Sequence, residues 1–375
     1  MLDKRRIEVG DTIAIKKSEL ETLLQTLAAA GYVPLGPQVR DTAIVYDRLE
    51  NADRLPKGYV TEQAPGRFRL VRAKHSRFFD FIPGAASWKQ FLFPPRLDLL
   101  TLRRNGKSWH QVGSRPEPNA YAFVGVRPCE LAAIQAQDKV FLREDYTDTT
   151  YQAQRTKVFI LAVNCIHPAG TCFCGTMGTG PRADSGFDLC LTELDEHFLV
   201  AVGSALGRDM VLDLAGESAS AFLLGSAENA LQHAAALTQC DIDPSTCAEA
   251  MLDDLDHPHW DEVAQRCLSC GNCTLACPTC FCWDVSDQTN LSMTETRRER
   301  TWDSCFNPTY SYQAGGNTRP TIRSRYRQWL SHKFGSWKQQ FGTLGCVGCG
   351  RCITWCPAGI DTRVEVATLQ KETEQ

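Results

Sequence analysis

The sequence Cys267-Leu-Ser-Cys270-Gly-Asn-Cys273-Thr-Leu-Ala-Cys277-Pro278 recurs as Cys346-Val-Gly-Cys349-Gly-Arg-Cys352-Ile-Thr-Trp-Cys356-Pro357. Both copies follow the pattern C-x2-C-x2-C-x3-C-P. In this pattern three closely spaced thiolates wrap one cubane iron-sulfur cluster, and the cysteine before proline ligates the other cluster. We therefore expect two [4Fe-4S] clusters with crossed ligands. The first set is Cys267, Cys270, Cys273 and Cys356, and the second set is Cys346, Cys349, Cys352 and Cys277.

Three glycines of these motifs, Gly271, Gly348 and Gly350, are expected to let backbone amides approach the cluster sulfides closely. Zinc also takes four thiolates, but zinc sites usually combine two separated cysteine pairs rather than two four-cysteine runs that end in proline. The spacing thus favours iron-sulfur clusters.

Cysteine is concentrated in the last part of the chain, because eleven of the 18 cysteines lie in residues 267–375. The segment Met1–Lys17 carries charges throughout and lacks the apolar core of a secretory signal, so we expect a cytoplasmic chain. Disulfides are rare under such reducing conditions, and dense cysteine then indicates metal ligation or redox chemistry.

Length and composition indicate an ordinary globular protein of two or three domains, with 375 residues and a net charge of -4. No basic excess suggests nucleic-acid binding, and no helix-turn-helix signature accompanies the clusters as in a redox-sensing regulator. The longest apolar stretch, around Val158–Ile166, is far too short to span a membrane.

Strand and helix patterns alternate up to about residue 250, which is typical of an α/β or α+β fold. Expected strands are residues 121–126, 158–163, 187–191 and 197–202, and expected helices are residues 18–31, 130–142 and 219–238. We predict an N-terminal α/β domain over residues 1–250 and a C-terminal dicluster domain over residues 251–375.

The predicted boundary is acidic, with eight acids and one base between Asp241 and Arg266. Residues 291–340 carry nine bases against three acids. These bases form a solvated face, pair with the acidic boundary inside the molecule, or dock a partner subunit.

The C-terminal domain is expected to be α-helical, because the stretches at Cys273 and Cys352 and residues 326–340 have helical patterns. The 68 residues between Cys277 and Cys346 are too many for a compact ferredoxin, so this domain resembles the α-helical ferredoxins of larger electron-transfer complexes. Three cysteines in this insert are either buried apolar residues or ligands to an unidentified group, namely Cys280, Cys282 and Cys305.

Four further cysteines follow strand ends or lie on a glycine-rich loop of the N-terminal domain. Cys129 lies where a strand turns into a helix, whose positive end favours a thiolate, and Cys165 follows the next strand. Cys172 and Cys174 lie on the loop, so the N-terminal set of Cys129, Cys165, Cys172 and Cys174 is a candidate third cluster site. Ordinary buried cysteines and a reactive thiol are the alternatives.

The motifs together resemble one family. The stretches that carry the resemblance are Gly125-Val-Arg-Pro-Cys129-Glu, Asn164-Cys165, Gly170-Thr-Cys172-Phe-Cys174-Gly, Cys277-Pro-Thr-Cys280-Phe-Cys282, Trp302-Asp-Ser-Cys305 and Gly315-Gly-Asn-Thr-Arg319. They resemble the beta subunit of soluble sulfhydrogenase-type nickel-iron hydrogenases, and they are similar to the iron-sulfur subunit of anaerobic sulfite reductases. Residues 1–119 match only in general character. The resemblance implies an iron-sulfur subunit between a flavoprotein that handles NAD(P)H and a catalytic subunit.

We therefore expect a non-catalytic electron-transfer subunit of an oxidoreductase complex. The chain has no flavin or nicotinamide motif, which places those cofactors on a partner. His167 and the pair His257 and His259 are expected to have surface or capping roles. The alternative is a stand-alone reductase whose α/β domain binds its own substrate. The sequence does not decide between a hydrogenase and a sulfite reductase as the catalytic partner, nor the direction of electron flow.

Overall fold

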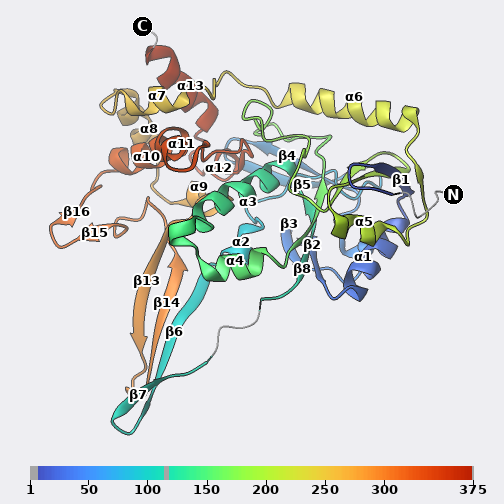
Figure 1. Cartoon of the computed structure of the whole chain (residues 1–375). Helices are drawn as coiled ribbons and strands as arrows, with labels where there is room; N and C mark the ends of the chain where they lie inside the picture. The colour runs from blue at the N-terminus through green and yellow to red at the C-terminus, as the bar shows by residue number, and fades with distance from the viewer. Residues whose placement is uncertain (1–6, 114–117, 374–375) are drawn as a thin grey trace.

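The computed structural model describes residues 7–113 and 118–373, and its centre is a mixed sheet of eight strands (Figure 1). The strand order is β12-β1-β11-β10-β9-β8-β2-β3. Strands β10, β9, β8 and β2 are parallel to one another, and the remaining pairs are antiparallel. The bounds are β12 (Gly216–Ser218), β1 (Thr12–Lys16), β11 (His197–Val202), β10 (Leu189–Glu193), β9 (Phe159–Val163), β8 (Tyr121–Val126), β2 (Val33–Arg40) and β3 (Ala43–Arg48).

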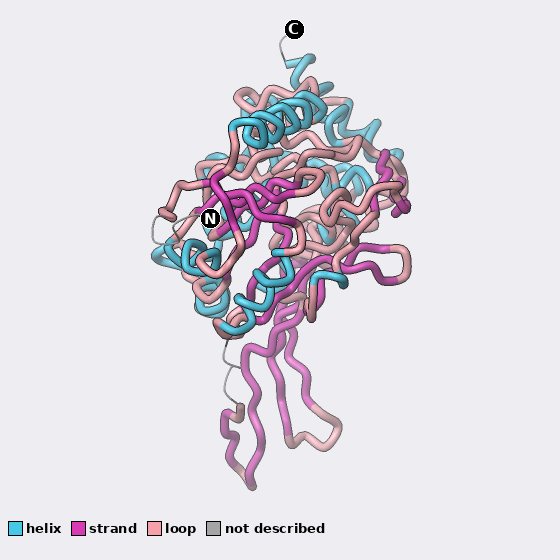
Figure 2. Tube along the Cα trace, turned by 90° about the vertical axis from the view of Figure 1, so that its right-hand side faces the viewer, coloured by secondary structure: helices cyan, strands magenta, loops and turns pink. Residues whose placement is uncertain are grey.

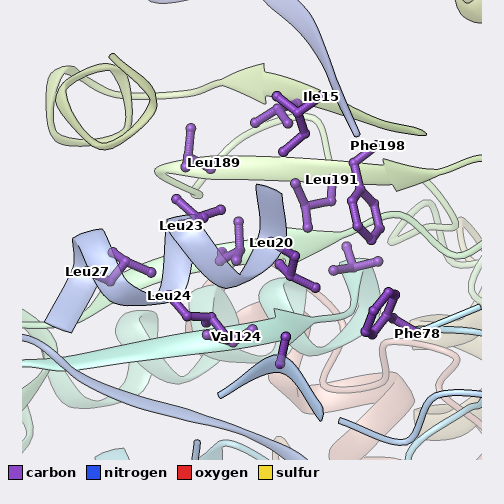
Figure 3. Packing of buried hydrophobic residues seen from close by; sticks show 14 of the residues in the cluster. Ile15, Leu20, Leu23, Leu24, Leu27, Phe78, Val124, Leu189, Leu191 and Phe198 are labelled. Atoms are coloured by element: carbon purple, nitrogen blue, oxygen red, sulfur yellow. The ribbon is translucent and has the colours of Figure 1, made fainter. Parts of the chain in front are cut away.

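One face of this sheet is covered by α1 (Glu19–Ala29), which is amphipathic. Its leucines recur at a spacing of three and four residues, so they share one face of the helix. Figure 3 shows Leu20, Leu23, Leu24 and Leu27 directed at Leu189, Leu191, Val124 and Phe198 of the sheet. All four leucines are buried, which fixes α1 on the sheet by the hydrophobic effect.

The opposite face packs against an aromatic cluster under α3 (Pro128–Phe141) and α4 (Thr149–Arg155). Trp88 stacks on Phe123 of β8 with a centroid distance of 4.5 Å, and Phe141 packs on Tyr151 at 4.8 Å. Further helices of this region are α2 (Lys89–Leu92), η2 (Ala52–Arg54), η3 (Glu144–Tyr146), α5 (Ala205–Val211) and α6 (Ala221–Leu237).

Short helices make up most of the C-terminal region, and they surround the two cysteine motifs. They pack through a separate core that includes Trp260, Phe306, Trp329 and Phe334. Their bounds are α7 (Cys247–Leu252), α8 (His259–Arg266), α9 (Asn272–Leu275), α10 (Ile322–Ser331), the π-helix η4 (His332–Ser336), α11 (Trp337–Phe341), α12 (Arg351–Thr354) and α13 (Thr362–Thr373).

A four-stranded sheet projects from the body of the molecule, as Figures 1 and 2 show. Its order is β13-β14-β6-β7, with bounds β13 (Trp283–Thr289), β14 (Glu295–Trp302), β6 (Arg96–Asn105) and β7 (Ser108–Gln111). Because β14 pairs with β6, the insert between the motifs is partly β-structure and is joined to the N-terminal region. Two hairpins, β4 (Tyr59–Ala64) with β5 (Arg67–Arg72) and β15 (Tyr312–Gln313) with β16 (Gly316–Asn317), complete the strands.

The expected helices and strands of the N-terminal region are present with small shifts. The strand expected at residues 187–191 is β10, which begins at Leu189 because Asp188 accepts a hydrogen bond from the Ile160 amide at 2.8 Å. The predicted acidic boundary contains α7 and α8. None of the helices in the described part of the chain is both long and apolar enough to cross a membrane.

Pairing inside the molecule is confirmed for part of the basic stretch. Arg323 lies 3.2 Å from Asp261 and 3.5 Å from Asp256, and Arg327 lies 3.6 Å from Asp256. These ion pairs hold the N-terminal end of α10 near α8.

Candidate iron-sulfur sites

The two cysteine motifs have the same local fold. Each has a residue in the left-handed region after its first cysteine, Ser269 with φ 53° and Gly348 with φ 62°. Each then has a glycine at the start of a one-turn helix, Gly271 with φ 76° before α9 and Gly350 with φ 72° before α12. Left-handed backbone turns the chain sharply, so three cysteines line the inside of one loop.

The first set converges on a small cavity between the two motifs. The four cysteines line it together with Phe306, Tyr326, Trp329 and Ile360. Cys356, which belongs to the later motif, is thus placed with the cysteines of the earlier motif. Backbone amides point at the sulfurs, from Ser269 to Cys267 Sγ at 3.3 Å and from Ile360 to Cys356 Sγ at 3.4 Å. Such N–H···S bonds are typical of iron-sulfur ligands.

The second set is also brought together. Burial raises the pKa of Cys346, Cys349 and Cys352, and the neighbouring Cys277 thiolate raises each of them further. A hydrogen bond from the Cys280 thiol holds the pKa of Cys277 well below its usual range, against the effect of burial. The Gly348 amide donates to Cys346 Sγ at 3.4 Å.

The N-terminal set lies at the carboxyl ends of the parallel strands β8 and β9. Cys129 is in the first turn of α3, Cys165 follows β9, and all four cysteines line one small cavity with Arg127 and Arg351. Burial raises the pKa of every thiol in this set, to about 12 for Cys174. Our expectation of a thiolate at Cys129 was wrong for the free thiol, because burial outweighs the effect of the helix end.

The cysteine loops of the N-terminal and second sets are in direct contact. The Phe173 amide donates to the Gly348 carbonyl at 2.8 Å, and Cys349 lines the cavity of the N-terminal set. A Cβ atom on Gly348 would lie 2.5 Å from the Phe173 carbonyl oxygen, so this approach requires glycine. Cys352, likewise, lines the cavity of the first set. The second set therefore lies between the other two.

The remaining cysteines of the insert lie beside the second set. Cys280 contacts Cys277. A hydrogen bond from the Cys305 thiol, together with one from the Tyr310 hydroxyl, lowers the pKa of Cys282 to about 6, against the effect of burial. Cys305 is buried in the C-terminal core.

Sequence reasoning missed several charged side chains next to the cysteines. Lys89 and Lys333 are buried beside Cys277, and Arg351 is buried between the second and N-terminal sets. The lysines carry no motif, so no signal in the sequence could identify them. Arg351 lies between Cys349 and Cys352, and its position inside the motif was a signal that could have been used.

The three histidines considered from the sequence lie outside the cavities of the first and N-terminal sets. His257 has the expected capping role, because its Nδ1 accepts from the His259 amide at 3.1 Å. His259 is buried rather than at the surface, and its Nε2 lies 2.8 Å from the Glu365 carboxylate. His167 is half exposed and pairs with the buried carboxylate of Asp80. In the described residues, no group of three or more His, Cys, Asp or Glu side chains is arranged to hold a single metal ion.

Comparison with known proteins agrees with the cysteine pattern. Residues 266–360 match the family described as a 4Fe-4S dicluster domain. Over 324 residues the chain is 33% identical to the sulfhydrogenase 2 subunit beta of Pyrococcus furiosus, and the match covers 84% of this chain and 92% of that relative. No solved structure matches the chain. The chain therefore belongs to the family of sulfhydrogenase beta subunits.

Proposed function

We propose that this chain is an electron relay with three [4Fe-4S] clusters, held by the first, second and N-terminal sets. The observation that carries the proposal is the row formed by the three sets, in which Cys349 and Cys352 of the second set line the cavities on either side. Bound clusters would supply one-electron redox chemistry at each site.

The residues around the sets fit this group. Each set offers four thiols that are largely removed from solvent, and backbone amides point at sulfurs of the first and second sets. Tyr326, Trp329 and Phe306 exclude water from one side of the first cavity. The protein's part is to hold the thiolates, to donate hydrogen bonds and to limit solvent access, which together set the potentials.

The row has one end close to the surface. Cys270 is exposed, and Leu268 nearby in the same loop is 65% exposed. An electron can leave or enter there over a short distance when a partner covers this end. We place the relay between an NAD(P)H-linked flavoprotein and a catalytic subunit, either a hydrogenase or a sulfite reductase, which is the role that the family resemblance implies.

Two measurements on the anaerobically purified chain test this proposal. Three cubane clusters require about twelve irons per chain, and two require about eight. The isolated chain should not reduce a dye with NAD(P)H or turn over sulfite, polysulfide or hydrogen, and an added flavoprotein partner should restore NAD(P)H-dependent reduction. Stoichiometric zinc without visible iron-sulfur absorbance would overturn the proposal. Turnover by the isolated chain would instead identify a stand-alone reductase.

A further inference from the structure

Two buried lysines approach the second set from distant parts of the chain. Lys89 of α2 and Lys333 of η4 are each only 4% exposed. The Lys89 ammonium donates to the carbonyl oxygens of Cys277 at 3.0 Å and of Cys280 at 3.2 Å. The Lys333 ammonium donates to the Gly345 carbonyl at 3.1 Å and to the Thr279 hydroxyl. Both cations thus border the ligand segment that begins at Cys277.

A hydroxyl group connects one of these cations to the sulfur. The buried Thr279 Oγ1 lies 3.2 Å from Cys277 Sγ, and it accepts a hydrogen bond from Lys333. Thr279 also donates to the Gly345 carbonyl at 2.6 Å, which fixes its rotamer. The positive charge of Lys333 is therefore held at a defined place beside a cluster ligand.

Neither lysine forms an ion pair with a carboxylate in the described part of the chain, although burying a lone ammonium group is unfavourable. Burial lowers the pKa of Lys89, and the thiolates of Cys280 and Cys277 oppose this effect. Burial also acts to lower the pKa of Lys333, but the thiolates of Cys277, Cys280 and Cys346 raise it above its usual value overall. The negative charge that balances these lysines must come from the sulfur side.

The other two sets have different surroundings. Arg127 and Arg351 line the cavity of the N-terminal set, but Arg351 is paired with Glu130 at 2.7 Å. Arg325 is a cation near the first set, where it acts on Cys267. The second set has two ammonium groups that no carboxylate of the described residues neutralises, and Arg351 also acts on its cysteine between the two motif glycines.

We propose that Lys89 and Lys333 are counter-charges of the second cluster and give it the highest reduction potential of the three. A reduced cluster is one charge more negative than an oxidised one, so fixed cations beside it favour the reduced state. This inference rests on the proposed function. It makes the middle cluster the place where an electron waits, so that a two-electron donor can deliver its electrons singly.

The test is an EPR-monitored redox titration of the full reconstituted chain, with iron counted in each sample. In K333M, we expect the ratio of reduced to oxidised second cluster at fixed solution potential to fall about tenfold or more. K89M should shift the same cluster in the same direction. K333R keeps the charge and should retain most of the wild-type potential. K338M is the matched control, because Lys338 is exposed on α11 and should leave all midpoints unchanged.

The outcomes separate this inference from the proposed function. A wild-type chain without clusters would refute the relay itself. Full iron in K333M and K89M with unchanged midpoints, or a shift confined to another cluster, would refute the role of the lysines. If K333M does not assemble, T279V keeps both lysines and removes the hydroxyl between Lys333 and Cys277. T279V should then lower the midpoint of the second cluster, and an unchanged midpoint would count against the proposal.

Discussion

Arg351 Nη2 lies 2.7 Å from Glu130 Oε1, and the two side chains are 3% and 1% exposed. Glu130 belongs to α3 beside Cys129, and Arg351 opens α12 within the second motif. Tyr46 donates to the same carboxylate at 3.0 Å, and Arg351 Nε donates to the Gly84 carbonyl at 2.9 Å. One buried ion pair thus fastens the second motif to the sheet of the N-terminal region.

Replacing Arg351 by methionine should destabilise the chain strongly. The change leaves the Glu130 carboxylate buried without its cation, for which we expect a loss of about 3–5 kcal/mol in the free energy of unfolding. Anaerobic urea unfolding, with iron counted in each sample, measures it. R363M removes a more exposed pair with Asp361 and should cost about 1 kcal/mol or less. Equal losses in the two variants would contradict this prediction.

Crossed ligation predicts which cysteines affect the same cluster. C356A and C270A should both alter the EPR signal of the first cluster, whereas C277A should alter that of the second, because Cys356 lines the first cavity and Cys277 does not. Each variant should retain the signal of the other cluster. If C356A altered the cluster of Cys346 instead, each motif would close on itself and the assignment would be wrong.

The N-terminal set can be tested by iron counting. C172A should reduce the iron content from about twelve to about eight per chain, since one cubane loses a ligand. C190A is the control, because Cys190 is also buried but lies in β10, outside the three cysteine sets. The EPR signals of the other two clusters should persist in both variants. Unchanged iron in C172A would show that these thiols are ordinary buried cysteines.

His259 makes stability depend on pH. Its hydrogen bond to Glu365 raises the pKa of His259 above its usual value of 6.5, and the Glu262 carboxylate, 3.1 Å from Nδ1, raises it further. A raised pKa in the folded state contributes stability that is fully present below pH 6.5 and is lost as the pH rises through the folded value. Arg266 also faces Glu365, at 2.9 Å, and stays charged throughout this range.

The measurement compares wild type with H259Q at about pH 5.5 and about pH 8.5, by anaerobic urea unfolding. H259Q should lower the free energy of unfolding more at the acidic pH than at the alkaline pH. H233Q is the control, because His233 is exposed on α6. A stability difference that does not change with pH would exclude the protonated imidazole as its source.

Iron removal should unfold the C-terminal region before the central sheet. The short helices there are held around the first and second sets, which lose their common ligand when iron is removed, while the leucines of α1 remain buried on the sheet. Hydrogen exchange after anaerobic chelation should therefore show α8–α13 losing protection first, with β8 and β9 still protected. Simultaneous loss in both regions would mean that the two parts unfold as one unit.

Much of the local structure could be predicted from the sequence, because its causes are local. The spacing of Leu20, Leu23, Leu24 and Leu27 predicts the buried face of α1, and the apolar run at residues 121–126 matches β8. The insert could not be predicted in the same way. β13 and β14 are largely exposed and have no regular apolar alternation, and the strand that completes their sheet, β6, lies far earlier in the chain.

The sequence by itself determined which thiols belong to each motif, because a loop with cysteines three residues apart can curl around one centre without help from the rest of the chain. Only the tertiary structure decided what lies next to those thiols. It places Cys349 beside the N-terminal set, Arg351 against Glu130, and the ammonium groups of Lys89 and Lys333 beside the segment of Cys277. The physical reason is that burial and charge act through space, between residues whose positions in the chain carry no sign of their proximity.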